Sequence, residues 1–135
     1  MQTSALPRPL ALLHHMRSVV GPIDTPGLTD DEVLSFLESD VNLERAIEEA
    51  HLRHEHLANE YPELYVGSAE TNLITSLQDG FVNFYNPATV NPYVALAARG
   101  PWIVTSHGAV VHDNGGYGML GAGHGPDHVL SLIHI

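Results

Sequence analysis

Cysteine and lysine are both absent from this chain of 135 residues. Without cysteine, the protein has no disulfide, no thiol chemistry and no cysteine-ligated zinc site. Without lysine, it has no side-chain amine that forms a Schiff base with a carbonyl compound. The basic residues are five arginines: Arg8, Arg17, Arg45, Arg53 and Arg99.

Long hydrophobic runs and basic charge are also scarce. No apolar run approaches the roughly 20 residues of a membrane span. Residues 10–13 are too short a run, followed by His14 and His15, to be the hydrophobic core of a signal peptide. Sixteen acidic residues give a formal net charge of −11, which argues against nucleic acid and anionic membranes as partners. We therefore expect a soluble, cytoplasmic protein.

Proline punctuates the first segment, residues 1–27, at four positions. Because proline lacks a backbone N–H and restricts the residue before it, this spacing disfavours long regular elements. We predict a mostly irregular segment, with one short helical possibility at residues 10–20.

Helical patterns dominate the second segment, residues 28–95. Thr29 and Glu32 have the spacing of a capping box and predict a helix through about residue 39. From Asp40, a second N-cap candidate, apolar residues recur at steps of three and four as far as Tyr61. A third helix is expected at residues 69–83, although a glycine weakens it. Either a short helix or an extended run is expected at residues 93–98.

A β-hairpin pattern distinguishes the third segment, residues 96–135. Residues 102–105 and 109–112 have the pattern of two strands around a turn at residues 106–108. Gly108 supplies the positive φ that a tight turn requires. N-terminal helices followed by a hairpin predict an α+β, or α/β, fragment.

Glycine is concentrated directly after the hairpin. Six glycines fall between Gly115 and Gly125. So many permissive backbone positions indicate main chain that passes close to a bulky group, either a cofactor or another backbone. Pro126 and Asp127 then mark a helix start, because proline suits the first helical turn and an acid suits the positive end of the helix dipole.

The hairpin and the loop after it contain one motif, which reads Gly-Pro-Trp-x-Val, a turn, Val-x-Asp and then Gly-Gly-Tyr-Gly-Met-Leu-Gly-x-Gly-His-x-Pro. This motif resembles the N-terminal segment of class III, fold type I, pyridoxal-phosphate aminotransferases. The resemblance covers about residues 96–130. Asp113 stands one position later than the family's usual acid, and Pro126 follows the Gly-His pair sooner than is common. The resemblance implies that the hairpin, the Gly-rich loop and the helix start belong to the small domain of such an enzyme.

The implied reaction moves an amino group between an amine or ω-amino acid and a 2-oxo acid, with pyridoxal phosphate as cofactor. The family also implies a homodimer with active sites at the subunit boundary. Its Schiff-base lysine and phosphate-binding segments lie downstream of the matched region. Because this chain contains no lysine, we expect a catalytically incomplete N-terminal part, with no catalytic residue of its own and no covalently bound cofactor.

Tyr117 is the strongest candidate for a substrate-binding residue. The resemblance aligns it with a loop tyrosine that contacts the amino-acid substrate in enzymes of the ornithine-transaminase type. It also implies that Gly116 and Gly118 are small so that substrate and cofactor approach the loop backbone. A packed aromatic beside the hairpin is the alternative role of Tyr117. Trp102 is expected to anchor the hairpin, and the imidazole of His124 to bind backbone at the helix start.

Asp113 is expected to fix the loop by accepting backbone N–H bonds, and His107 to be a simple turn residue.

Two other ligand-binding patterns are weak. Gly116-x-Gly118-x-x-Gly121 formally satisfies the dinucleotide-binding fingerprint, but the helix start comes only at Pro126, after the glycines. His51 and His54 have the helical spacing of a metal-ligand pair, and the sequence offers no evident further ligand. We therefore expect no metal ligands, with His54 on the apolar stripe of its helix.

Two functions from other classes stay open beside the aminotransferase. A helical protein-interaction module at residues 28–85 would fold and bind a partner without the hairpin. A small metal-binding protein would retain zinc through His51 and His54.

Overall fold

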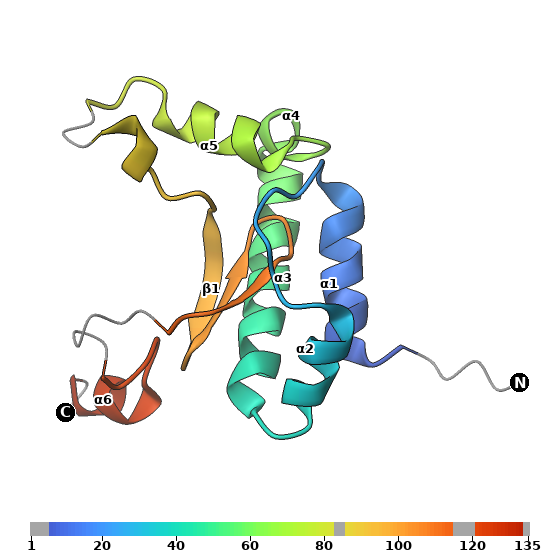
Figure 1. The fold of residues 1–135 in the computed structure, drawn as a ribbon, viewed down its shortest axis with the longest axis vertical. Coiled ribbons are helices and arrows are strands. Elements are labelled where there is room, and N and C mark those ends of the chain that lie inside the picture. The colour runs from blue at the N-terminus through green and yellow to red at the C-terminus, as the bar shows by residue number, and fades with distance from the viewer. Residues whose placement is uncertain (1–5, 83–85, 115–120, 134–135) are drawn as a thin grey trace, which may run out of the picture.

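The computed structural model describes residues 6–82, 86–114 and 121–133 of the chain. The elements in these ranges are α1 (Arg8–Val19), α2 (Asp30–Leu37), α3 (Val41–Glu60), α4 (Pro62–Tyr65), α5 (Glu70–Gln78), the short 3₁₀ helix η1 (Pro87–Thr89), β1 (Ala95–Arg99), β2 (Trp102–Thr105), β3 (Val110–His112) and α6 (Asp127–Ile133). Helices therefore precede a small sheet, and a helix follows it (Figure 1).

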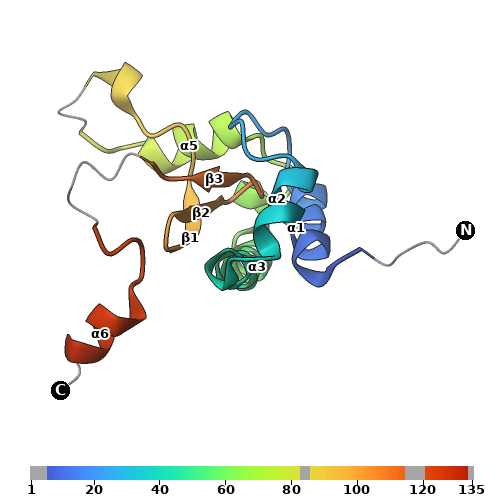
Figure 2. The ribbon, with the colours of Figure 1, turned by 60° about the horizontal axis from the view of Figure 1, so that its bottom comes forward.

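The three strands form an antiparallel sheet in the order β1-β2-β3. Ile103 pairs with Ala98 on one side and with Val111 on the other. Helix α3 packs against β1 and β2, and α1 and α2 pack against α3. Figure 2 shows α1, α2 and α3 together beside the sheet. The start of α6 contacts α3, because Arg45 Nη1 donates to Asp127 Oδ2 at 2.6 Å. The arrangement is α+β, as predicted, and its finer assignment to a fold type I small domain stays a prediction.

One hydrophobic core joins the helices to the sheet. Its buried members come from α1, α2, α3 and all three strands: Leu10, Leu13, Met16, Val33, Leu43, Ala46, Ile47, Ala50, Leu96, Ala97, Trp102, Val104 and Val110. Burial of this apolar surface is the main source of stability. Because the three predicted segments share this core, the helices and the hairpin depend on each other.

The two predicted N-caps are confirmed. Thr29 and Glu32 form the complete capping box of α2, in which each side chain accepts a backbone N–H from the other residue. Asp40 begins α3, and its Oδ1 accepts the backbone N–H of Asn42 at 2.9 Å. The other oxygen of Asp40 accepts a hydrogen bond from Trp102 Nε1 at 2.7 Å. The cap of α3 is thereby bonded to the hairpin, as expected for an anchoring tryptophan.

One local prediction is corrected, and two open alternatives are decided. The short helical possibility at residues 10–20 of the first segment is confirmed as the helix α1, because Leu10, Leu13 and Met16 recur at helical spacing and are buried against α3. The helix predicted at residues 69–83 ends at Gln78, before Gly80 with its φ of 78°. The run at residues 93–98 is extended, and most of it belongs to β1.

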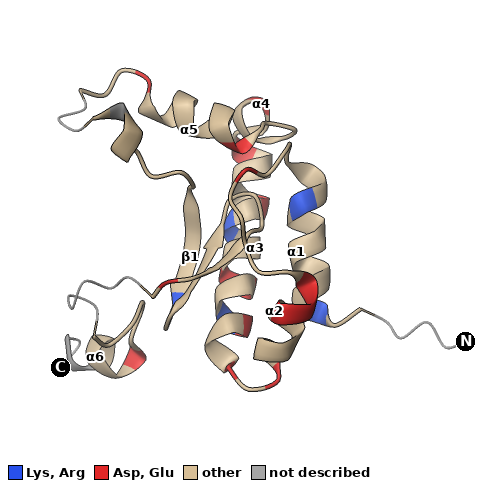
Figure 3. Cartoon of the chain, viewed as in Figure 1, with Lys and Arg blue, Asp and Glu red and all other residues tan. Residues whose placement is uncertain are grey.

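Acidic residues dominate the charged positions of the helices. Figure 3 shows them together on α2 and repeated along α3. Three of them, Asp30, Asp31 and Glu32, occupy the first turn of α2, where the helix dipole favours negative charge. Within the described ranges, no helix is long and apolar enough to cross a bilayer.

Candidate functional site

The proposed substrate-binding residues Tyr117, Gly116 and Gly118 lie outside the described residues. The structure does describe both ends of the Gly-rich segment that contains them. Asp113 follows β3, and the chain returns at His124. His124 Nε2 and Asp113 Oδ2 lie 2.8 Å apart, so one side-chain contact joins the two ends of the segment.

Backbone bonds to Gly100 reinforce this closure. The N–H of Gly100 donates to His124 O at 2.9 Å, and the N–H of His124 donates to Gly100 O at 2.8 Å. We call Gly100, Asp113, Gly123 and His124 the neck of the Gly-rich loop. The neck holds the two described ends of the Gly-rich segment together beside the end of β1.

One side-chain prediction at the neck is corrected. The imidazole of His124 was expected to bind backbone, but it binds the Asp113 carboxylate, and the main chain of His124 makes the backbone bonds. The expectation that the Asp113 carboxylate accepts backbone N–H groups stays a prediction, beside its contact with His124. The sequence did not indicate this pairing because ten residues separate the partners.

Arg99 fixes the start of α6 next to the neck. Its Nη2 donates to Glu49 Oε1 at 2.6 Å, and its Nη1 donates to Gly125 O at 2.9 Å and to Asp127 Oδ1 at 3.0 Å. Hydrogen bonding to Glu49 raises the pKa of the Arg99 guanidinium. The guanidinium therefore remains charged and links α3, β1 and α6.

Gly123→Ala is expected to open the neck. Gly123 has a φ of 74°, and an added Cβ would lie 3.0 Å from Gly100 Cα and 3.1 Å from Gly100 O. The positive φ and the nearby backbone together should cost about 1 kcal/mol or more. We expect faster hydrogen exchange at the amides of Gly100 and His124. Gly121→Ala is the control, because a Cβ at Gly121 meets no atom of the described residues within 4 Å. Unchanged exchange in Gly123→Ala would contradict the close packing.

Buried hydrogen bonds join His54 of α3, Tyr65 of α4 and the backbone of Ser106. Tyr65 Oη donates to the backbone oxygen of Ser106 at 2.6 Å and lies 2.8 Å from His54 Nδ1. Because the single phenolic proton goes to the carbonyl, His54 Nδ1 must carry the proton that it shares with Tyr65. His54 Nε2 is then an unprotonated nitrogen with a free lone pair.

His54 is fully buried on α3. Its Nε2 has no hydrogen-bond partner in the described part of the chain. Burial lowers the pKa of His54 to about 4, although the nearby Glu55 charge acts in the opposite direction. Burial also raises the pKa of Tyr65. Both groups are therefore neutral near pH 7.

Three further polar side chains gather beside His54 at the contact of α1 with α3. His15 Nδ1 lies 3.2 Å from His51 Nε2 and 3.4 Å from Glu55 Oε1. His51 Nε2 lies 3.8 Å from Glu55 Oε1. One ligand atom from each of His15, His54 and Glu55 lies within 4.8 Å of the other two. We call these four residues the histidine cluster.

The sequence indicated only part of this cluster. The spacing of His51 and His54 was recognised, and Glu55 was an available signal, because it lies one helical turn after His51. His15 could not be found from spacing, because it comes from α1. No metal ligands were expected, because the sequence offered no evident further ligand, and the structure places His15 and Glu55 near His54.

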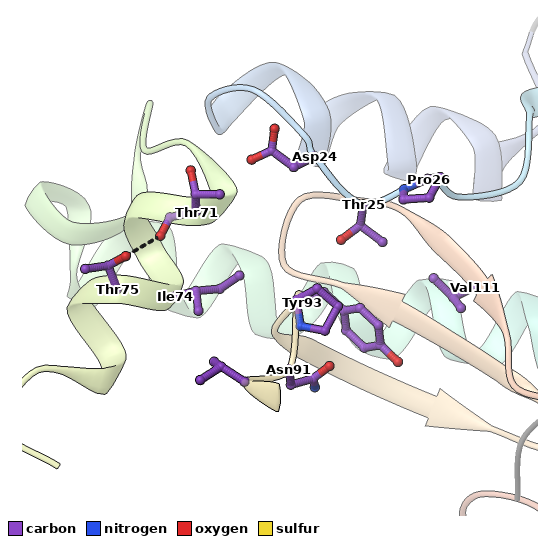
Figure 4. A pocket seen from close by; sticks show the side chains of 11 residues that line it. Asp24, Thr25, Pro26, Thr71, Ile74, Thr75, Asn91, Tyr93 and Val111 are labelled. Atoms are coloured by element: carbon purple, nitrogen blue, oxygen red, sulfur yellow. Dashed lines mark hydrogen bonds between the residues drawn. The ribbon is translucent and has the colours of Figure 1, made fainter. Parts of the chain in front are cut away.

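A separate open cavity of about 530 Å³ lies between the loop before α2, α5 and the end of β3 (Figure 4). Its lining residues are Asp24, Thr25, Pro26, Thr71, Ile74, Thr75, Val90, Asn91, Pro92, Tyr93 and Val111. Behind it, the buried Glu70 holds the loop, because its Oε2 accepts the N–H groups of Asp24 and Thr25 at 2.9 and 2.7 Å. Among the described residues that line the cavity there is no cationic side chain, so it is not suited to a phosphate group.

Comparisons with family models, curated proteins and solved structures return no match for this chain. The resemblance to class III aminotransferases therefore stays an expectation from the residue pattern at about residues 96–130 alone.

Proposed function

We propose that this chain is the N-terminal part of a class III pyridoxal-phosphate aminotransferase. The proposal is supported mainly by the neck, in which the motif residues Asp113, Gly123 and His124 bring the two described ends of the Gly-rich segment together beside Gly100. A segment whose ends are held together by a rigid scaffold is suited to border a ligand site. In this proposal Tyr117 contacts the substrate, with Gly116 and Gly118 leaving room for it.

The residues of this chain do not fit covalent binding of the cofactor. The sequence has no lysine, and a transaminase requires a lysine amine for its Schiff base. The cationic side chain nearest the neck in sequence, Arg99, is already bonded to Glu49 and Asp127. The proposal therefore assigns no reaction step to this chain, and its role is to shape the substrate entrance of a homodimeric enzyme that uses an amine or ω-amino acid and a 2-oxo acid.

The helical-module alternative is less well supported. It requires residues 28–85 to fold without the hairpin, whereas Ala97, Trp102 and Val104 are buried in the same core as α3. Removal of these strands would expose the apolar face of α3 to water, at about 25 cal/mol for each Å² of apolar surface.

The proposal is tested with the gene product that continues beyond residue 135. We expect a lysine at a strand end, an aspartate for the pyridine nitrogen and transaminase activity with pyridoxal phosphate. In that enzyme Tyr117→Phe should raise KM for the amino donor more than it lowers kcat, because the phenol is assigned to binding. A continuation without such a lysine, or an active enzyme insensitive to Tyr117→Phe, would count against the assigned role.

The chain of 135 residues alone should form at most one reducible adduct with pyridoxal phosphate. Its only primary amine is the α-amino group of Met1, since the sequence has no lysine. After borohydride reduction, mass spectrometry of proteolytic fragments should locate any pyridoxyl group on the N-terminal fragment. A pyridoxyl group on any other fragment would overturn this expectation.

A further inference from the structure

The histidine cluster brings nitrogen and oxygen ligands from two helices to one point. His51, His54 and Glu55 belong to α3, and His15 reaches them from α1, which runs beside α3 (Figure 1). His51 and Glu55 are one helical turn apart, so they share a helix face. This arrangement joins residues that are about 40 positions apart in the sequence.

We propose that His15, His51, His54 and Glu55 bind a divalent transition-metal ion, with zinc as the preferred ion. Tetrahedral zinc with metal–ligand distances of about 2.1 Å places its ligand atoms about 3.4 Å apart. His15 Nδ1, His51 Nε2 and Glu55 Oε1 form a triangle with sides of 3.2, 3.4 and 3.8 Å. This triangle has nearly the size of one face of the coordination tetrahedron.

We assign His54 as the fourth ligand. Its buried and unpaired nitrogen is a second reason to expect a metal ion, independent of the triangle of ligand atoms. Its side chain is completely buried, and its Nε2 has no hydrogen-bond partner among the described residues. A buried polar atom without a partner is destabilising, and a lone pair near the ligand atoms of His15 and Glu55 is suited to a metal ion. The Nδ1 bond to Tyr65 fixes the ring, as second-shell partners of metal-binding histidines do.

The cluster is open to ions on one side. The His15 and Glu55 side chains are 49% and 45% exposed, so a hydrated ion reaches them before it reaches His54. Four protein ligands fill a tetrahedral site, which indicates a structural ion and not a catalytic one. The ion would tie α1 to α3, and the inference does not depend on the proposed aminotransferase.

The test is titration of the chain, without an affinity tag, with zinc chloride in a calorimeter. We expect one site per chain and a higher thermal midpoint with zinc, since the ion binds only the folded state. Cobalt(II) should give the visible absorption spectrum of a tetrahedral site. Loss of a second-shell partner typically weakens metal binding about 10–100-fold, and we expect this range for Tyr65→Phe. His15→Ala removes a ligand itself, so it should weaken zinc binding at least as much.

His56→Ala is the matched control, because His56 lies on the same helix, is 71% exposed and pairs with Glu60. His54→Ala is not a decisive test, because removal of this buried side chain can destabilise the fold as well as the metal site. The variants His15→Ala and His51→Ala are therefore used to test the ligands. Circular dichroism establishes that each variant is folded before titration. Absence of zinc binding in the parent chain, or equal affinities in His15→Ala, His51→Ala and His56→Ala, would overturn the proposal.

Discussion

Trp102→Ala is expected to lower the free energy of unfolding by about 3–5 kcal/mol, the range for removing a large aromatic side chain from a core. Trp102 is 2% exposed. Its ring lies 4.9 Å from that of Phe36 and 4.8 Å from that of His112, centroid to centroid. Its Nε1 also bonds the Asp40 cap of α3 at 2.7 Å. The substitution therefore removes core packing and the bond between the hairpin and α3 together.

The measurement is urea unfolding followed by far-ultraviolet circular dichroism, because Trp102 is the one tryptophan of the chain. Trp102→Phe is the matched control. It keeps most of the apolar contact and loses only the Nε1 donor to the half-buried Asp40. We therefore expect a smaller loss, about 1 kcal/mol, the usual net contribution of one hydrogen bond. A loss below about 1 kcal/mol in Trp102→Ala would contradict the assignment of this residue as the hairpin anchor.

Tyr65→Phe is expected to have the second-largest effect. The hydroxyl of Tyr65 is the partner of both Ser106 O and His54 Nδ1. Its removal leaves two buried polar groups unpaired, each at a cost of about 1–3 kcal/mol. The ring remains, so little apolar burial is lost, and the expected destabilisation comes from polar groups alone.

Tyr61→Phe controls for the loss of a phenol. Tyr61 is 50% exposed, and its hydroxyl contacts Glu60 at 3.2 Å, so its removal should change stability by less than about 0.5 kcal/mol. Thermal and urea unfolding of both variants provide the comparison. Equal stability of Tyr65→Phe and Tyr61→Phe would show that the hydrogen bonds among His54, Tyr65 and Ser106 do not stabilise the fold.

Local sequence patterns predicted the elements whose signals lie within a few residues. The capping box at Thr29 and Glu32, the cap at Asp40 and strand β2 are as expected. His107 is a turn residue, as predicted, but it is buried, with its Nε2 2.8 Å from Ser68 O. Local patterns specify backbone conformation, and they do not specify how deeply a turn is packed.

Helix α1 shows how packing decides between local alternatives. The prolines of residues 1–27 favoured irregular chain with one short helical possibility, and Pro7 and Pro9 stand at the helix start, where no intrahelical N–H bond is lost. The burial of Leu13 and Met16 against α3 then stabilises the helix. Tertiary packing outweighs a weak propensity in this way.

The sequence by itself determined the charge, the absence of lysine and hence of a lysine Schiff base, the helix caps and the hairpin. Only the tertiary structure brought His124 to Asp113 and His15 to Glu55. It also buried His54 beside Tyr65, which makes the imidazole neutral and leaves one nitrogen without a partner in the described chain. The physical reason is that composition and capping act within one or two turns, whereas these contacts and this loss of hydration exist only once distant elements pack together.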